Sequence, residues 1–538
     1  MCNEHVGILD YWPLVLNCKE VSSDDYKEIS DKMFIYYHEK DTDRHPPFNL
    51  EQIDTIGDSD FVAWFAFDKA QFKIICSFAT NCRLQQVAIF LCKLRTALSN
   101  EKLGFLFGVS RETIRTSIQA VIEDLTEKMV PAFINTNDRS TLLSHKTPIS
   151  SALFEIGEEN GCVIFDATYR VVQKSQNFSG QKELWSEQKK MPLNKPMVGC
   201  APDGYILFVL GPYDAKHNDA AILKDCFNRY DVNTIKNGDT ILVDRGFRDA
   251  LPFLKEKGLK VYCPGLGQLN TNAANESRFV TKVRWVIEQV FGRLKMKFKL
   301  FAIPAQNSTL CHDYKSLVVA CALLNLFHSP ILSDTEHEDI AAEMKRRSLK
   351  NNNLKAVVEE HNLTQVRAPY HDIEYTALDN ADNNQLLNFP QLSKDDLFDI
   401  SLGKYQIKNA VSYYAEHLKE GIFLVQKFEP NRRHRTANID FRKYGIEINK
   451  PLLIKALMKS RFRGGKQHYI FILLDNEAVG RQAISEYYCT CESGSRTVGC
   501  CSHIMAIIWY LGWGQYNGIH LPNPTITKAS ITIPKNAY

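Results

Sequence analysis

Three acidic residues stand in settings where a carboxylate needs a cation. Asp166 lies inside a near-continuous apolar run, and Asp244 directly follows a second apolar stretch. An aspartate among apolar neighbours is costly unless it is paired, protonated or bound to a metal. Glu288 is the single acid of a strongly basic segment with helical periodicity. These residue types and settings indicate a site for divalent cations.

The chemistry that such a site would perform is phosphoryl transfer. Carboxylate oxygens are the ligands that Mg²⁺ and Mn²⁺ prefer. Two such ions about 3.5–4 Å apart stabilise the attacking and the leaving oxygen of an in-line displacement at phosphorus. Each acid taken singly also has an ordinary structural role open to it. Acids at strand ends often cap helices, and Glu288 can pair with Arg284 one turn earlier.

The elements that must position these acids alternate between strands and helices, which is the pattern of an α/β domain. The apolar runs predict strands over 161–172, 195–201, 205–210, 240–243 and 260–263, and helices over 218–230 and 277–299. The Pro-Asp-Gly tripeptide at 202–204 separates two of these strands as a hairpin turn. Between residues 278 and 299 the last helix carries seven bases and one acid. Its Arg284, Arg293 and Lys295 are therefore predicted to contact a polyanion.

A series of short motifs follows this order of elements. The motifs are FDAT at 165–168, KPMV at 195–198, PDGYI at 202–206, ND at 218–219, VDRGF at 243–247 and VIEQVFGRLK at 286–295. Over about residues 161–327 this series resembles the PIF/Harbinger-like DDE superfamily endonucleases. The resemblance implies an RNase H-like mixed sheet flanked by helices. It also implies that Asp166, Asp244 and Glu288 are the catalytic ligands of two Mg²⁺ or Mn²⁺ ions.

The same resemblance gives other residues supporting roles. Asp219 matches a further recurring acid, and Lys195 and Arg245 lie in the matching motifs as accessory residues. Lys195 is expected to neutralise the DNA backbone together with the bases of the 277–299 helix. Ala167 stands where the family usually has glycine after the first aspartate, a mild departure that removes no carboxylate.

Upstream of the acids, three helices are predicted over 85–98, 101–107 and 110–125. In the third, apolar residues recur at the period of one helix face, and Ser110 stands at the N-cap. The short break before it fits a helix-turn-helix, which would place Arg111, Thr113 and Arg115 against DNA. The segment also resembles the one that precedes the nuclease core in the same family. Any three-helix packing unit with two solvated arginines would show the same pattern.

The C-terminal part contains a cysteine cluster with metal-ligand spacing. Cys489, Cys491, Cys501 and His503 form the pattern C-x-C-x(n)-C-x-H, which resembles a SWIM-type zinc finger over about residues 481–513. Three thiolates and one imidazole fill a tetrahedral Zn²⁺ site, so the metal would be structural. Cys500 competes with Cys501 by position, but only Cys501 keeps the one-residue spacing to His503. A small buried core or a disulfide is the alternative.

These features divide the chain into five regions. They are an unassigned region 1–80, a helix-turn-helix unit 81–135, a nuclease domain 155–330, a polar linker 331–388, and a small α+β region 389–538 that contains the zinc finger.

The bulk composition narrows the function without identifying it. The formal net charge is only +3, so nucleic-acid binding must rest on local basic clusters. The first residues lack the pattern of a signal peptide, and the longest apolar run, 316–327, is too short for a membrane span. The 15 cysteines lack the spacing of a disulfide scaffold. A reducing intracellular compartment is therefore expected and, with DNA as the substrate, the nucleus.

Together these features predict a DDE-type transposase that cuts and joins double-stranded DNA at element ends and target sites. Because paired ends must be cut, a homo-oligomer is expected, and no membrane partner is. Two other functions share the same features. One is a non-cleaving DNA-binding protein that keeps the fold. The other is a protein-interaction factor that binds a protein partner through the zinc module.

Overall fold

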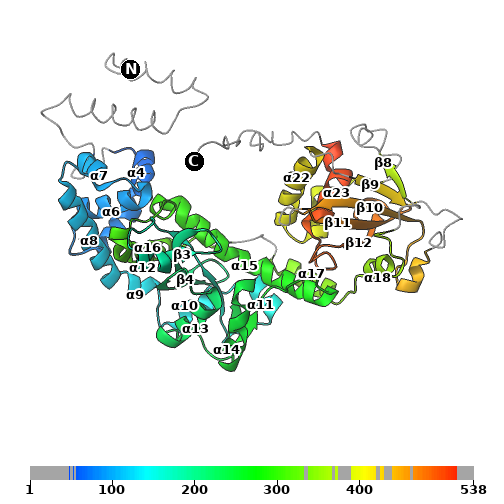
Figure 1. The fold of residues 1–538 in the computed structure, drawn as a ribbon, viewed down its shortest axis with the longest axis horizontal. Coiled ribbons are helices and arrows are strands. Elements are labelled where there is room, and N and C mark those ends of the chain that lie inside the picture. The colour runs from blue at the N-terminus through cyan, green and yellow to red at the C-terminus, as the bar shows by residue number, and fades with distance from the viewer. Residues whose placement is uncertain are drawn as a thin grey trace, which may run out of the picture. The chain divides into compact units, whose positions relative to one another are not determined.

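The computed structural model describes residues 48, 53, 56–331, 337–365, 370–373, 389–419, 424–428, 439–460 and 465–517. The chain divides into two compact units, 1–121 and 122–538. Figure 1 shows the helices of the first unit and the helices and sheets of the second. Most of the region that was left unassigned from the sequence, 1–80, lies outside the described residues.

The first unit is helical. Its helices are α4 (Asp58–Phe65), α5 (Lys69–Phe78), α6 (Leu84–Thr96), α7 (Asn100–Phe107) and the start of α8 (Arg111–Lys128). Side-chain caps fix where the last two begin. Ser99 accepts a hydrogen bond from the amide of Lys102, and Ser110 accepts one from the amide of Thr113 at 3.1 Å. All three helices predicted for this part of the chain are confirmed as helices.

The helical unit begins earlier than the predicted boundary at residue 81. Helix α4 packs against both α5 and α6. Its Phe61 and Phe65 are fully buried and contact each other, and Phe61 also meets Phe72 of α5 edge to face. These two helices were not predicted, because they are only 8 and 10 residues long and too short to give a strong periodic signal.

The turn between α7 and α8 is tight. Gly108 has a φ of 66°, and the amide of Val109 donates to the carbonyl of Gly104 at 2.9 Å. A Cβ on Gly104 would lie 2.7 Å from the carbonyl oxygen of Val109. The close approach of the two helices therefore requires glycine at position 104.

The second unit contains a mixed sheet. Its strands are β1 (Cys162–Ala167), β2 (Arg170–Val171), β3 (Trp185–Ser186), β4 (Met191–Cys200), β5 (Ile206–Tyr213), β6 (Thr240–Leu242) and β7 (Lys260–Tyr262). β4 is antiparallel to β5 and to the central β1, whereas β1, β6 and β7 run parallel to one another. The sheet is therefore mixed, and the α/β prediction is confirmed. The run 161–172, predicted as one strand, forms two, β1 and β2.

Helices flank this sheet. The longer ones are α13 (Asp219–Arg229), α15 (Thr271–Lys297) and α16 (Leu310–Leu326), and the shorter ones are α9 (Val130–Phe133), α10 (Arg139–Ser144), α11 (Pro148–Phe154), α12 (Phe178–Leu184) and α14 (Leu251–Glu256), with the 3₁₀ helix η3 (Arg245–Ala250). Residues of α13, η3 and α14 share one apolar cluster with β1 and β6. α15 contacts β1, and α16 contacts β5. The predicted helices over 218–230 and 277–299 are confirmed.

Helix α16 contains the longest apolar run of the sequence. Its residues 316–323 are buried within the fold. Among the described residues, no helix combines the length and the apolar character that a membrane crossing needs.

The segment predicted as a polar linker, 331–388, is partly folded. α17 (His337–Ser348) packs against α11 and α15, while α18 (Asn353–Glu360) and β8 (Tyr370–Ile373) belong to the C-terminal fold. Leu354, Val357 and Val358 are buried at helical spacing in an otherwise polar stretch. The linker prediction is therefore wrong for these residues, because three apolar side chains on one face are enough to dock a short helix.

The C-terminal fold is a five-stranded antiparallel sheet in the order β12-β11-β10-β9-β8. The strands besides β8 are β9 (Leu424–Phe428), β10 (Pro451–Lys459), β11 (Gln467–Asp475) and β12 (Ile484–Cys489). Helices α21 (Lys394–Ser401), α22 (Lys404–Lys419) and α23 (Ser502–Gly512) cover one face, and α18 with η7 (Phe441–Tyr444) covers the other. Alternate residues of β10 and β11 enter the two cores.

Candidate carboxylate site and zinc centre

The alternation of side chains along β1 and β6 directs Asp166 and Asp244 to one face of the sheet. The odd-numbered residues of 163–167 in β1 and of 241–243 at β6 enter the core beneath α13 and α14. Asp166 therefore faces the opposite side, where α15 contacts β1. Asp244 follows β6 and, like Asp166, is even-numbered, whereas the core-facing residues of both segments are odd-numbered. Both carboxylates therefore face α15.

A single guanidinium joins the three predicted catalytic carboxylates. Nη1 of Arg284 is 3.6 Å from Oδ2 of Asp166, and its Nε is 3.9 Å from Oδ1 of Asp244. Its Nη2 is 2.6 Å from Oε1 of Glu288. The pair with Glu288 is the ordinary i,i+4 ion pair that the helix alone predicts. Asp166 comes from β1 and Asp244 from the residues after β6, so the arrangement is a cluster instead of a surface pair.

The electrostatics of this carboxylate cluster favour a cation. Burial raises the pKa of the Asp166 carboxyl to about 7, an effect that Arg284 opposes and Asp244 strengthens. The amide of Ala167 donates to Oδ1 of Asp166 at 2.9 Å. A neighbouring positive charge lowers the free energy of carboxylates that are buried and close to one another. The oxygen atoms around Arg284 are all carboxylate oxygens, the ligand type that hard divalent cations prefer.

Lys195 is buried beside Asp219. Its ammonium donates to the carbonyl of His217 at 2.9 Å, and it lies 3.3 Å from Oδ1 of Asp219. Its role toward the DNA backbone stays a prediction. The strand β4 points this residue inward, and its charge is matched by Asp219.

Tyr169 is a neighbour of the cluster that the sequence did not reveal. Its ring faces the ammonium groups of Lys189 and Lys195, at 5.1 and 5.7 Å. Burial, followed by the charge of Asp219, raises the pKa of the Tyr169 phenol to about 12. A tyrosine three positions after Asp166 carries no signal of this role, because its position is set by the turn between β1 and β2.

The other predicted cations have different surroundings. Arg245 forms an ion pair with Glu492 at 3.3 Å. Arg293 donates to the carbonyl of Ser329, and Lys295 is half-buried in the last turn of α15. Of the three α15 bases predicted to contact DNA, Arg284 alone lies at the carboxylate cluster.

The residues predicted to read DNA lie at the start of α8. Arg111, Thr113 and Arg115 are all exposed. Arg111 pairs with Glu101 at 3.0 Å, and Arg115 pairs with Glu112. Exposed ion pairs of this kind contribute little to stability because water and salt screen them. An anionic partner can therefore displace them at little cost.

The four predicted zinc ligands converge. The ligand atoms of Cys489, Cys491, Cys501 and His503 lie within 4.8 Å of one another, and all four residues are buried. Sγ of Cys489 is 3.9 Å from Nδ1 of His503. Sulfur and nitrogen ligands of one tetrahedral Zn²⁺ are separated by about 3.6 Å. The donor set and its spacing therefore fit Zn²⁺ with no position left open.

The proton equilibria of the thiols also favour a cation. Burial opposes ionisation of Cys501, but hydrogen bonds from Cys489, Cys491 and His503 hold the pKa of its thiol well below the usual range. Burial raises the pKa of the Cys489 thiol well above that range. A bound Zn²⁺ would allow all three ligating thiols to ionise, because the metal stabilises each thiolate.

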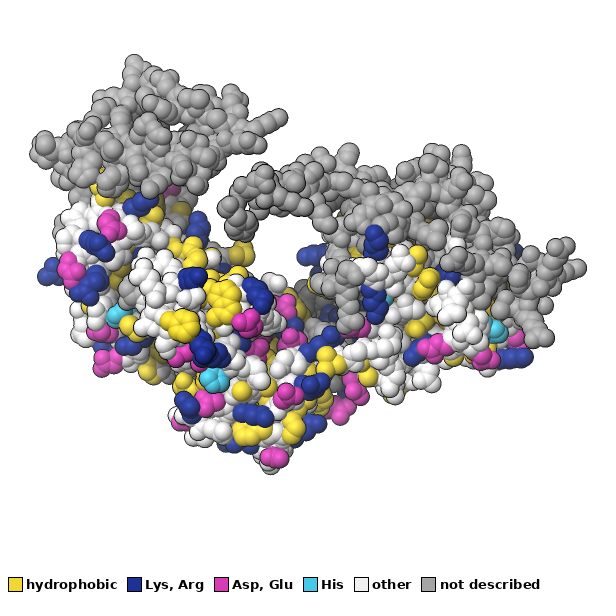
Figure 2. Space-filling model, in the orientation of Figure 1, with side chains coloured by type: hydrophobic (Ala, Val, Ile, Leu, Met, Phe, Trp, Pro, Cys, Tyr) yellow, Lys and Arg dark blue, Asp and Glu magenta, His cyan; other side chains and the backbone are white. Residues whose placement is uncertain are grey.

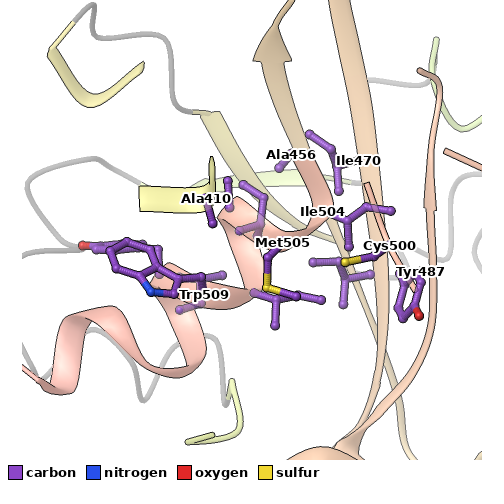
Figure 3. Close-up of a cluster of buried hydrophobic side chains, with 14 of the residues drawn as sticks. Ala410, Ala456, Ile470, Tyr487, Cys500, Ile504, Met505 and Trp509 are labelled. Carbon is purple, nitrogen blue, oxygen red and sulfur yellow. The ribbon is translucent and has the colours of Figure 1, made fainter. Parts of the chain in front are cut away.

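The structure separates the two adjacent cysteines. Cys501 is the N-cap residue of α23, and its sulfur is one of the converging ligand atoms. Cys500 lies in the apolar cluster with Tyr487, Ile504 and Met505, as Figure 3 shows. Cys501 therefore lies with the other three candidate ligands, and Cys500 is a core residue.

Comparison with protein families matches both sites. Residues 165–325 match the family model described as DDE superfamily endonuclease, which spans the chain from β1 into α16 and includes the three carboxylates. Residues 165–325 form a DDE superfamily endonuclease domain. Residues 471–512 match the SWIM zinc finger family and include the four zinc ligands. No curated protein and no solved structure gives a significant match to the chain.

The SWIM zinc finger is anchored to the endonuclease domain by buried hydrogen bonds. Asn275 of α15 accepts from the amides of Thr497 and Val498 and donates to the Thr497 hydroxyl. The hydroxyl of Ser495 donates to the carbonyl of Leu269 at 2.8 Å. A buried polar group that loses its partner costs about 1–3 kcal/mol. The segment from Cys489 to His503, which carries the four ligands, is called the zinc loop. These bonds therefore hold the zinc loop against the N-terminal part of α15.

A second buried polar cluster in the endonuclease domain was not anticipated. Oδ2 of Asp203 lies 2.7 Å from Nδ1 of His145 and 3.1 Å from Nε2 of His328. His145 also stacks on the ring of Tyr205 at 3.9 Å. The sequence showed Asp203 only as a turn residue between β4 and β5. Its carboxylate ties that turn to the segments before α11 and after α16.

Acidification should weaken this cluster. Burial opposes ionisation of Asp203, but hydrogen bonds from His145 and His328 outweigh it and hold the pKa of the carboxyl well below its usual range. A depressed folded-state pKa contributes stability that is complete above the unfolded value of about 4 and is lost as the pH falls below it. Asp203→Asn should therefore destabilise the domain by about 1–3 kcal/mol at neutral pH and by less at about pH 3. Thermal unfolding across this range measures the difference, and a constant difference at every pH would contradict the prediction.

Proposed function

We propose that the chain is a DDE-type transposase that cuts and joins double-stranded DNA, with Asp166, Asp244 and Glu288 holding two Mg²⁺ or Mn²⁺ ions. The observation that supports the proposal is the convergence of these three carboxylates on Arg284 within an endonuclease domain. When bound, such ions activate the attacking oxygen and stabilise the leaving oxygen at phosphorus.

The residues of the chain would set the geometry of the reaction. Asp166 is fixed on the central strand, while the side chains of Asp244 and Glu288 are 47% and 58% exposed and can reach a bound substrate. Arg284 balances the carboxylates and, once they are neutralised, would donate to phosphate oxygens. Lys195 pairs with Asp219 and would hold its carboxylate in place beside the site.

The proposal also includes the type of transposase, the DNA-binding unit and the oligomeric state. The chain would be of the PIF/Harbinger-like type, and the α6–α8 unit would act as a helix-turn-helix that places Arg111, Thr113 and Arg115 against DNA. Arg293 and Lys295 would contact the backbone outside the carboxylate cluster. The transposase would work in the nucleus as a homo-oligomer, because two element ends must be cut together.

A strand-cleavage assay on double-stranded DNA tests the proposed function. The protein is expected to nick DNA in Mg²⁺ or Mn²⁺ and to leave it intact in a chelator. Tight DNA binding without metal-dependent nicking would support the non-cleaving DNA-binding protein instead. Loss of a protein partner in zinc-ligand variants whose DNA affinity is unchanged would support the protein-interaction factor.

Replacing Arg284 by alanine should tighten Mn²⁺ binding. The guanidinium and the ions are attracted to the same three carboxylates, and an opposite charge within about 4–6 Å shifts carboxylate equilibria by 1–3 pK units. Removal of the guanidinium should therefore raise the Mn²⁺ affinity by about tenfold while cleavage falls. Titration calorimetry with MnCl₂ in the absence of DNA measures this effect.

Arg293→Ala is the matched control for this titration. Arg293 is on the same helix and carries the same charge, but it donates to the Ser329 carbonyl away from the cluster. Its replacement should leave the Mn²⁺ affinity unchanged. Weaker Mn²⁺ binding in the Arg284→Ala variant than in wild type would contradict the prediction.

A further inference from the structure

A cavity of about 900 Å³ lies between the endonuclease domain and the SWIM zinc finger. One wall is formed by residues 278–289 of α15, and another by the zinc loop, including the ligands Cys491 and His503. The cavity reaches the carboxylate cluster, because Arg284 and Glu288 are part of its wall. Its size matches a ligand pocket of about 300–1,000 Å³ and is too small to enclose a duplex.

The wall of this cavity is strongly cationic. Eight lysine and arginine side chains line it, against two glutamates. They come from several elements, with Lys282 on α15, Lys408 on α22, Lys466 before β11 and Arg496 in the zinc loop. The whole chain carries a net charge of only +3, and cationic and acidic side chains are interspersed on the face in Figure 2. The concentration of positive charge in a recess favours an anionic occupant.

Aromatic side chains lie among these cations. Trp285 follows Arg284 on α15 and is half-buried, and Tyr405 at the start of α22 is 68% exposed. Exposed rings beside cations are typical of sites that stack unpaired bases while the cations follow the phosphate backbone. A base within a duplex is already stacked and paired, so it cannot use such a ring. The composition of the wall therefore favours a single strand over a duplex.

We propose that this cavity takes the unpaired DNA strand next to the scissile phosphate, with the SWIM zinc finger as one of its walls. The proposal rests on the endonuclease function proposed above and names the form in which DNA enters the site. The role of the zinc centre is then architectural. It fixes the loop that carries Arg496, and Asn275 holds that loop opposite the catalytic part of α15.

Two variants at exposed positions of α22, Lys408→Glu and Tyr405→Ala, test the proposal without touching the carboxylates. Binding is measured by fluorescence anisotropy without added Mg²⁺ or Mn²⁺ and without a chelator, so that catalysis does not contribute and the structural zinc is kept. The probes are a blunt DNA duplex and the same duplex with a single-stranded overhang. Wild type should prefer the overhang probe.

Tyr405→Ala should lower affinity for that probe by about 5- to 100-fold, since one stacked base is lost. Lys408→Glu should lower it too and reduce the salt-dependence slope by about 1.

Lys443→Glu is the control, because Lys443 is exposed on η7 and is not part of the cavity wall. It should bind both probes as wild type does, and all variants should unfold at the wild-type temperature. Equal binding of the two probes by wild type, or an unchanged overhang preference in both cavity variants, would overturn the proposal. An overhang preference that depends on the cavity, in a protein that never nicks DNA in Mg²⁺, would support the cavity and reject only the endonuclease function.

Discussion

Asp244→Ala should abolish metal-dependent DNA cleavage while the protein stays folded. Asp244 supplies one of three carboxylates around Arg284 and is proposed as a direct metal ligand. Loss of even an indirect partner of a metal ligand costs about 10–100-fold in affinity or activity, so loss of a ligand should cost more than about 100-fold. The fold should survive, because the side chain is 47% exposed and makes no capping hydrogen bond at η3. Nicking rates in Mg²⁺ and the unfolding temperature measure the two effects.

Asp249→Ala is the matched control for this substitution. Asp249 is an acid on the same short helix, its side chain is 70% exposed, and its ion pair is with Arg248. The control should cleave DNA at the wild-type rate. Cleavage by Asp244→Ala within about tenfold of wild type would show that this carboxylate is not a catalytic ligand, since a ligand must cost more than an indirect partner.

Cys501→Ala should remove zinc from the protein and unfold the C-terminal fold. The apparent binding free energy of a structural Zn²⁺ site is about 10–16 kcal/mol at neutral pH, and this energy is folding energy. Cys501 also caps α23, whose residues form much of the core beneath the sheet. Metal analysis should find one zinc ion per wild-type chain and little in the variant. Thermal unfolding should lose the transition of the C-terminal fold.

The adjacent cysteine provides the control. Cys500→Ala removes a sulfur from the apolar cluster and not from the converging ligands. It should cost roughly 1–2 kcal/mol through a small cavity, and the zinc content should stay at the wild-type value. Loss of zinc in Cys500→Ala with retention in Cys501→Ala would reverse the ligand assignment.

The zinc variant should also affect DNA cleavage, although its site lies in a different domain. The zinc loop is held to α15 through Asn275, and the same helix carries Arg284 and Glu288. Release of the loop would therefore expose one side of the cavity that reaches the carboxylates. Such coupling between a zinc finger and a nuclease helix is invisible in the motifs, which lie about 200 residues apart.

The sequence by itself determined the local elements and the residue types of both sites. A near-continuous apolar run identified the strand of Asp166, and the 3.6-residue period identified the helix of Glu288, because both patterns depend only on neighbours in the chain. The spacing of Cys489, Cys491, Cys501 and His503 predicted a metal cluster for the same reason. A segment of 15 residues that carries all four ligands can bring them together in only a few conformations.

The tertiary structure alone decided which distant groups meet. Arg284 gathers carboxylates from two strands and one helix, Lys195 turns inward to Asp219, and Asp203 pairs with two histidines from separate segments. No repeat in the sequence connects these positions, because their contacts depend on how the sheet and the helices pack. For the same reason the sequence did not predict the helix around Val357 in the region interpreted as a linker. This helix is stabilised by a sheet whose strands follow it in the chain. Local patterns set the elements of this protein, and packing decided the surroundings of each charged group.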